Sequence, residues 1–203
     1  MSRYEKANVG NGCSHHYNDP YCFAKIAEAV CSFISGTNRT ASKNVVYICI
    51  GTDRATGDSL GPLVGAKLKR MLPFASIFGT LEEPVHAVNL QEVLANILDS
   101  YDKPLIMAVD ACLGKLERVG FININSGGLK PGTALGKDLP EVGDFHISGV
   151  VNVGGFLEHI VLQNTRLCIV YKMADVIAKG LFLAHSRLYQ TDVRDPLVRK
   201  EVP

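Results

Sequence analysis

The chain has 203 residues, of which 47% are hydrophobic, 20% charged and 7% aromatic, and its 21 basic and 20 acidic side chains leave a formal net charge of +1. This composition excludes collagen-like, low-complexity and disordered proteins, and the interspersed charges disfavour nucleic-acid and membrane-surface partners. Six cysteines without a C-x-x-C pair, and no apolar stretch of the about 18 residues that a membrane helix needs, indicate a cytoplasmic protein with free thiols.

Four segments are expected along the chain. Residues 1–19 are polar and lack periodicity, which predicts a mobile leader. Asp19 is a candidate helix cap, and the apolar residues after it recur at helical spacing, so residues 20–43 are predicted to form a helical arm and a connector. Residues 44–188 are expected to form the main domain. The mixed-charge stretch over residues 189–203 predicts a poorly ordered tail.

Apolar runs alternate with amphipathic segments in the main domain, which is the pattern of a βαβ fold. Strands are predicted over residues 45–50, 75–79, 105–109, 119–124 and 167–171, and helices over 63–71, 90–101, 148–161 and 176–188. Asn89 with Glu92 resembles a capping box, and Ser148 is a candidate cap. The run 119–124 follows 105–109 too closely for a helical crossover and is expected to run antiparallel. These elements predict an α/β domain with a mixed five-stranded sheet between helical layers.

Three polar segments lie where ligands bind in such sheets, beyond the carboxyl ends of the strands. GTDRATGDSLGP follows the first strand and carries Asp58, VDAC follows the third and carries Asp110, and GDFHISG precedes the fourth helix and carries His146. Each residue also has a purely structural interpretation. Asp58 could cap a helix, Asp110 could form a turn, and His146 could simply flank a helix.

Two carboxylates held close together cannot both ionise freely, so one pKa rises and the pair can act as acid and base near neutral pH. Asp58 and Asp110 are the candidates for this division of labour in peptide hydrolysis. Alternatively, the two aspartates and His146 form an open site for a divalent metal, with nickel or zinc favoured over magnesium because imidazole takes part. The residues leave both alternatives open.

Two further kinds of chemistry have weaker support. Cys112 could act as a nucleophile with His146 or His86 as its base. The glycine-rich loop after the first strand could approach a nucleoside or an anion, but its spacing matches neither the phosphate-binding loop nor the dinucleotide fingerprint.

IGTDRATGDSLGPLVG, LIMAVDACLG and HISGVVNVGGFLEHIVLQNTRLCIV occur in this order and resemble the sporulation proteins of the YyaC type, a group related to the germination (spore) protease and, more distantly, to the hydrogenase maturation proteases. The likeness covers roughly residues 44–188. It implies a three-layer α/β/α sandwich of the phosphorylase/hydrolase-like kind. It also implies that Asp58 and Asp110 occupy shared catalytic or acidic metal-contacting positions, and that His146 occupies the third metal-contacting position of the maturation proteases.

The expected function is that of a sporulation-associated peptidase that cleaves a protein or peptide substrate through Asp58 and Asp110, with His146 as an auxiliary or metal-binding residue. The loop over residues 125–144 could form a groove wall or lid, or a plain surface loop. The alternative is a non-catalytic sporulation factor that binds a partner protein through the same loop face.

Overall fold

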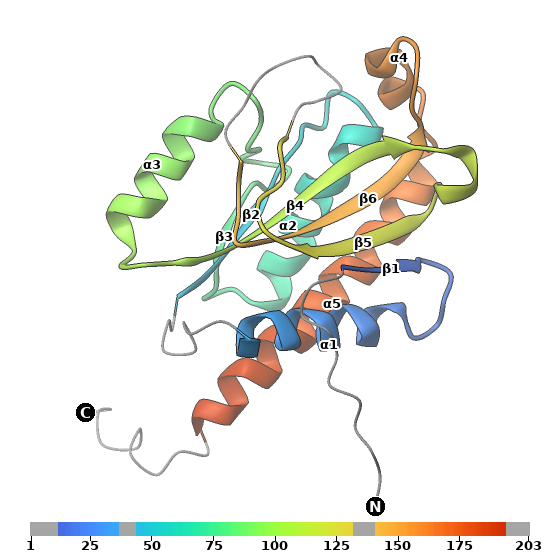
Figure 1. Ribbon diagram of the computed structural model, residues 1–203. Helices are drawn as coiled ribbons and strands as arrows, with labels where there is room; N and C mark the ends of the chain where they lie inside the picture. Colours follow the sequence, from blue (N-terminus) through green and yellow to red (C-terminus); the bar gives the residue numbers. More distant parts are fainter. Residues whose placement is uncertain (1–11, 37–43, 132–140, 194–203) are drawn as a thin grey trace, which may run out of the picture.

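Six strands form one mixed sheet with helices packed on both of its faces (Figure 1). The computed structural model describes residues 12–36, 44–131 and 141–193. The elements are, in chain order, β1 (Cys13–His16), α1 (Cys22–Gly36), β2 (Val45–Cys49), η1 (Gly57–Ser59), α2 (Leu60–Met71), β3 (Ser76–Phe78), α3 (Leu90–Ser100), β4 (Leu105–Gly114), η2 (Leu116–Arg118), β5 (Phe121–Ser126), β6 (Phe145–Val153), α4 (Glu158–Gln163) and α5 (Leu167–Val193).

The strand order is β1-β5-β6-β4-β2-β3. Strands β6, β4, β2 and β3 run parallel, whereas β5 lies antiparallel to β6 and β1 lies antiparallel to β5. The antiparallel direction predicted for the fourth strand is confirmed, although its neighbours are β6 and β1 rather than β4. The carboxyl ends of the four parallel strands therefore meet at one edge of the sheet.

Alternation along β2 builds two separate cores. Tyr47 and Cys49 pack with α1, α2 and α5 on one face, while Val46 and Ile48 pack with α3 on the other. All five residues of β2 are buried, which explains why this strand has no polar alternation in the sequence. The buried strand residues of the cluster on the α3 side come from β2, from Ile50 directly after it, and from β4. Strands β1 and β5 contribute none to this cluster.

The prediction of a five-stranded sheet is wrong because part of the expected leader is a sixth strand. Cys13–His16 pairs along its whole length with β5. An edge strand has one neighbour and half-exposed side chains, so it needs no apolar run and leaves no strong signal in the sequence. The remainder of the predicted leader, residues 1–11, lies outside the described residues.

Two predictions near the carboxyl end are corrected by the structure. The segment predicted as a helix over 148–161 begins as strand β6 and is helical only from Glu158, in α4, and the segment predicted as a strand over 167–171 is the beginning of α5. At Gly149 the strand passes close beneath α2, because a Cβ there would lie 2.4 Å from a Leu60 side-chain carbon. Short apolar runs do not distinguish a strand from a buried helix.

The other expected segments are described in part. The helical arm is α1, whereas residues 37–43 of its connector lie outside the described ranges, as do residues 132–140 of the predicted lid or groove wall. Helix α5 continues beyond Tyr189, into the predicted tail. Within the described ranges, none of the helices combines the length and apolarity that a bilayer crossing requires.

Candidate functional site

Asp58 lies at the carboxyl end of β2, in the short helix η1 that leads into α2. The loop after β2 folds back on itself, and the Thr52 N–H donates to the Asp58 carbonyl oxygen at 3.2 Å. Gly51 permits this return, because its φ is +139° and a Cβ there would lie 2.0 Å from the same oxygen. Ser59 directly precedes α2, and no side chain caps that helix. The interpretation of Asp58 as a helix cap is therefore wrong.

Asp110 lies inside β4, which was predicted to end one residue earlier and continues to Gly114. Only 8% of Asp110 is exposed. Its side chain points to the same side of the sheet as Ala108, a member of the α3-side core, because alternate strand residues point the same way. The Ala111 N–H donates to Asp110 Oδ1 at 2.7 Å. Asp110 is thus a buried carboxyl on a central strand rather than a turn residue.

The charge of Asp58 acts on the carboxyl of Asp110. Helix η1 packs against β4, and burial followed by the nearby charge of Asp58 raises the pKa of Asp110 well above its usual range. Burial also raises the pKa of Asp58, but the Thr52 N–H and the positive potential of His86 oppose that rise. The proton therefore resides more readily on Asp110, while Asp58 ionises more readily.

His146 lies on the same side of the sheet as Asp110, but its ring nitrogens contact Asn125 and Gly127 rather than either aspartate. It stands opposite Ala108 in the pairing of β4 with β6, two residues before the partner of Asp110. Its Nδ1 contacts the Gly127 carbonyl oxygen at 2.9 Å, and its Nε2 contacts the Asn125 side-chain amide at 3.3 Å. An Nδ1–H tautomer satisfies both contacts, with Nδ1 donating and Nε2 accepting.

This arrangement does not fit a nickel or zinc centre formed by Asp58, Asp110 and His146. Both ring nitrogens of His146 already have partners. Across the part of the chain that the structure describes, no three His, Cys, Asp or Glu side chains are grouped closely enough to hold a metal ion. The described residues therefore do not support a metal role for Asp58, Asp110 and His146, and no chemical step below depends on one.

His86 is a member of the site that the sequence suggested only as a base for Cys112. The preceding residue, Val85, bridges to Ile50 at the end of β2. Asn89 does not form the predicted capping box, because its Oδ1 instead accepts the His86 N–H at 2.8 Å. The Val88 N–H donates to His86 Nδ1 at 3.3 Å. No local motif reveals this contribution, since it depends on how the loop packs against β2.

Cys112 is also close to the aspartates, but it has the wrong chemistry for a nucleophile. Burial raises the pKa of its thiol to about 11, the charge of Asp110 adds to the rise, and a hydrogen bond with Ser148 opposes it. The reactive form of cysteine is the thiolate, and here the thiol stays protonated near neutral pH. The structure therefore disfavours a thiol mechanism.

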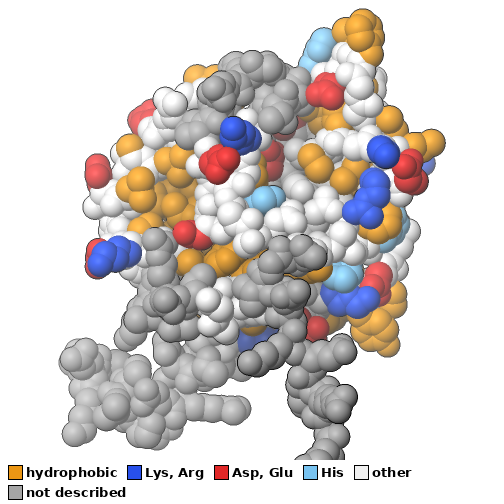
Figure 2. All heavy atoms as spheres, viewed as in Figure 1, with side chains coloured by type: hydrophobic (Ala, Val, Ile, Leu, Met, Phe, Trp, Pro, Cys, Tyr) orange, Lys and Arg blue, Asp and Glu red, His pale blue; other side chains and the backbone are white. Residues whose placement is uncertain are grey.

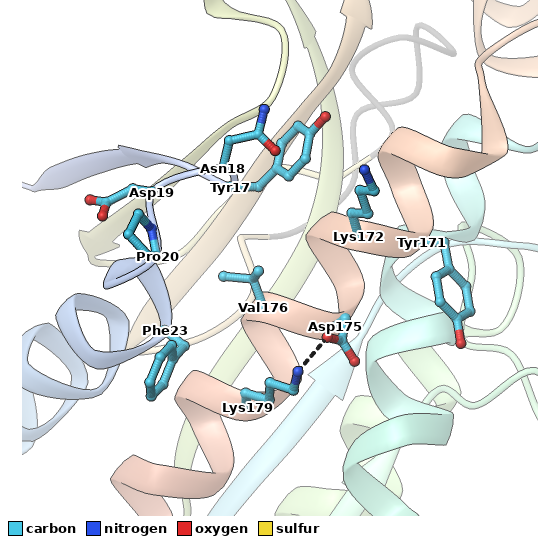
Figure 3. A pocket seen from close by; sticks show the side chains of 10 residues that line it. All are labelled: Tyr17, Asn18, Asp19, Pro20, Phe23, Tyr171, Lys172, Asp175, Val176 and Lys179. Carbon is cyan, nitrogen blue, oxygen red and sulfur yellow. Dashed lines mark ion pairs between the residues drawn. The ribbon is translucent and has the colours of Figure 1, made fainter.

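A separate pocket of about 670 Å³ lies on the side of the sheet that α1 and α5 cover, between the turn that precedes α1 and one face of α5 (Figure 3). Its acidic residues are already paired, Asp19 with Lys25 and Asp175 with Lys179, each at 2.7 Å. Asp58, Asp110 and His146 do not line it. The pocket is thus distinct from the site at the strand ends.

Asp110→Asn is expected to raise the thermal unfolding midpoint near pH 7 and above. A carboxyl whose pKa is raised on folding stabilises the native state at low pH, and this stability is lost as the pH rises through the folded-state pKa. The amide carries no such dependence. Unfolding scans between pH 4 and 8 should therefore show an advantage of the variant that grows with pH. A constant difference across that range would contradict the shifted pKa.

Comparisons with known proteins show that the region shared with relatives begins before the expected main domain of residues 44–188. The family described as "Protein of unknown function (DUF1256)" matches residues 14–180. "Uncharacterized protein YyaC" of Bacillus subtilis (strain 168) is 52% identical over 166 residues, which are 81% of this chain and 81% of that protein. The resemblance to YyaC-type proteins is confirmed, and the relation to the two protease groups stays a prediction. The family match begins within β1 and includes α1, unlike the likeness over residues 44–188.

Proposed function

The chain belongs to the DUF1256 family, and we propose that it is a peptidase that hydrolyses a protein or peptide substrate with Asp58 and Asp110 as its acid/base pair. One observation carries the proposal: a buried Asp110, whose pKa is raised, lies within the electrostatic influence of a half-buried Asp58. Environments that separate the pKa values of two neighbouring carboxyls are what acid/base catalysis requires. We further propose that the sheet belongs to the phosphorylase/hydrolase-like sandwiches and that the peptidase acts in sporulation.

Each aspartate has one role in the proposed reaction. The oxygen of a water molecule attacks the peptide carbonyl carbon while Asp58 accepts the water's proton and Asp110 donates its proton to the carbonyl oxygen. When the resulting diol collapses, a hydroxyl proton returns to Asp110, the proton on Asp58 passes to the leaving nitrogen, and the C–N bond breaks. The pair ends in the protonation state in which it began.

His86→Gln is expected to move the acid limb of the activity profile to higher pH. The positive potential of His86 opposes the rise in the pKa of Asp58, so its removal lets that pKa increase. Since Asp58 must be ionised to accept a proton, activity then appears only at higher pH. Measurement of kcat/KM between pH 4 and 9 tests this, with His159→Gln on the exposed side of α4 as the control. An unshifted acid limb would show that His86 has no influence on the base.

A peptide library provides the test of the function. The full-length protein is incubated with a mixture of defined peptides, and mass spectrometry identifies new termini. Wild type should produce cleavage products that are absent from a preparation carrying both Asp58→Asn and Asp110→Asn. Products of equal yield from both preparations would come from a contaminant and would contradict the proposal.

The second candidate is the non-catalytic sporulation factor that binds a partner protein. Apolar side chains exposed around the start of α4 favour it: Phe156 is 87% exposed, and Leu157 and Ile160 are 48% and 41% exposed. Helix α4 packs beside η1, so this apolar group adjoins the Asp58 loop. If wild type yields no cleavage products at any pH between 4 and 9, this candidate replaces the first.

A further inference from the structure

One side of the sheet carries a row of polar residues that leads to Asp110. Ser14 pairs with Asn123, Asn123 with Ser148, and Ser148 with Asp110, so the row crosses β1, β5, β6 and β4 in register. The Ser14 hydroxyl donates to Asn123 Oδ1 at 2.7 Å, and Asn123 Nδ2 donates to Ser148 Oγ at 3.4 Å. We call this the polar row.

The polar row lies on the same side of the sheet as α3, and no described helix covers it where it crosses β5 and β6. On β5 and β6, the residues that pack under the helices are those in between, such as Ile122, Ile124 and Ile147. In Figure 1 no helix is drawn in front of β4, β5 and β6. Figure 2, viewed from the same side, shows that the middle of this face is mostly white, the colour of uncharged polar side chains and backbone. Ser14, Asn123 and Ser148 are all partly exposed.

Arg118 lies at the end of the polar row that is remote from Asp110. Its Nη2 donates to Ser14 Oγ and, at 3.0 Å, to Asn123 Oδ1. Its guanidinium carbon lies 4.0 Å from the centre of the Phe121 ring. Three neighbours thus fix the orientation of a side chain that in solution would sample many conformations.

No carboxylate of the described chain forms an ion pair with Arg118. A guanidinium carries five N–H donors, and the bonds to Ser14 and Asn123 both leave from a single nitrogen. The other nitrogens keep donors in the planar geometry that suits a carboxylate. Among the described residues, Arg118 is thus a half-buried cation held in place without an acidic partner, which is the chemistry that recognises an anion.

We propose that Arg118 binds a carboxylate of the peptide substrate, about three residues from the cleaved bond. Asn123 is two strands from Asp110, or about 10 Å at the usual strand spacing, and three residues of an extended peptide span about the same distance. The proposal rests on the proposed peptidase function. The carboxylate belongs either to the carboxyl terminus of the substrate or to an acidic side chain, and the chemistry of recognition is the same for both.

The test compares three pools of fluorescein-labelled hexapeptides of random, non-acidic sequence. The first pool ends in a free carboxylate, the second in an amide, and the third in an amide with one position replaced by Glu. Dissociation constants are measured by fluorescence anisotropy with the full-length Asp110→Asn protein, so that no peptide is consumed. One or both carboxylate pools should bind about tenfold more tightly than the neutral pool, because a charge-assisted hydrogen bond contributes that much.

Adding Arg118→Gln should reduce this preference to about onefold, and Arg118→Lys, which retains the charge but not the planar fork, should leave an intermediate preference. A preference for the first pool alone assigns the terminus, and one for the third alone assigns a side chain. If Arg118 only held β1 against β5, its loss would raise the dissociation constants of all three pools by the same factor. Equal affinities in the parent protein, or a preference that survives Arg118→Gln, would overturn the proposal.

Two controls keep the outcomes separate. Thermal unfolding shows whether Arg118→Gln folds, and if it does not, Arg118→Lys supplies the comparison. The peptidase proposal fails if wild type cleaves no peptide of the library. The carboxylate proposal fails on the affinity ratio alone, whatever the result for cleavage.

Discussion

Asp58→Asn and Asp110→Asn are each expected to lower kcat/KM for peptide cleavage by about 10³-fold, the order of magnitude that a positioned acid or base contributes. Asparagine keeps the size of either side chain but can neither accept the proton of water nor donate an acid proton. The double variant should be little worse than either single variant, because the two groups act as a unit. Initial rates on a peptide identified from the library provide the measurement.

Asp53→Asn is the matched control, because this exposed aspartate lies in the same loop as Asp58. It should retain wild-type rates. The two limbs of the pH profile separate the roles further: ionisation of Asp58 should govern the acid limb and loss of the Asp110 proton the alkaline limb. Wild-type turnover by either Asp58→Asn or Asp110→Asn would eliminate the acid/base mechanism.

Gly61→Ala is expected to lower the free energy of unfolding by about 3 kcal/mol or more. A Cβ at this position would lie 2.0 Å from the Ile50 carbonyl oxygen, at the end of β2. The oxygen is part of the backbone and the alanine Cβ has no rotamer that avoids it, so α2 must move off the sheet. Because η1 continues directly into α2, Asp58 moves with it, and cleavage should fall along with stability.

Arg70→Ala is the control for this effect, since it changes an exposed residue of the same helix. Its free energy of unfolding should stay within about 0.5 kcal/mol of wild type. Urea denaturation at one pH gives both values. A wild-type midpoint for Gly61→Ala would mean that α2 is not held tightly against the end of β2.

Strands β2 and β4 and helix α3 were predictable because they satisfy local rules. Val45–Cys49 is continuously apolar because it is buried on both faces, and α3 has strong helical periodicity. Strand β1 was missed because it is stabilised by pairing with β5, more than a hundred residues away along the chain. Strand β6 was missed because its place in the sheet depends on close contact with α2 at Gly149. Local patterns carry no information on such partners.

The candidate site divides in the same way. The rule that ligands bind at the carboxyl ends of parallel strands selected Asp58 and Asp110 from the sequence, and in the structure the charge of Asp58 raises the pKa of Asp110. This rule did not reveal His86, whose charge acts on Asp58 only because the segment around Val85 pairs with Ile50 at the end of β2. Nor did it reveal that His146 is bonded to Asn125 and Gly127.

The sequence by itself determined that two acidic residues follow buried strands of an α/β sheet, because burial leaves a direct mark on residue type. Only the tertiary structure decided which of the two carboxyls keeps its proton, and which cation faces the same surface. Arg118 and Asp110 lie on one face because four strands pair in register. Burial and the field of neighbouring charges are properties of the folded chain, since both depend on distances that the order of residues does not specify.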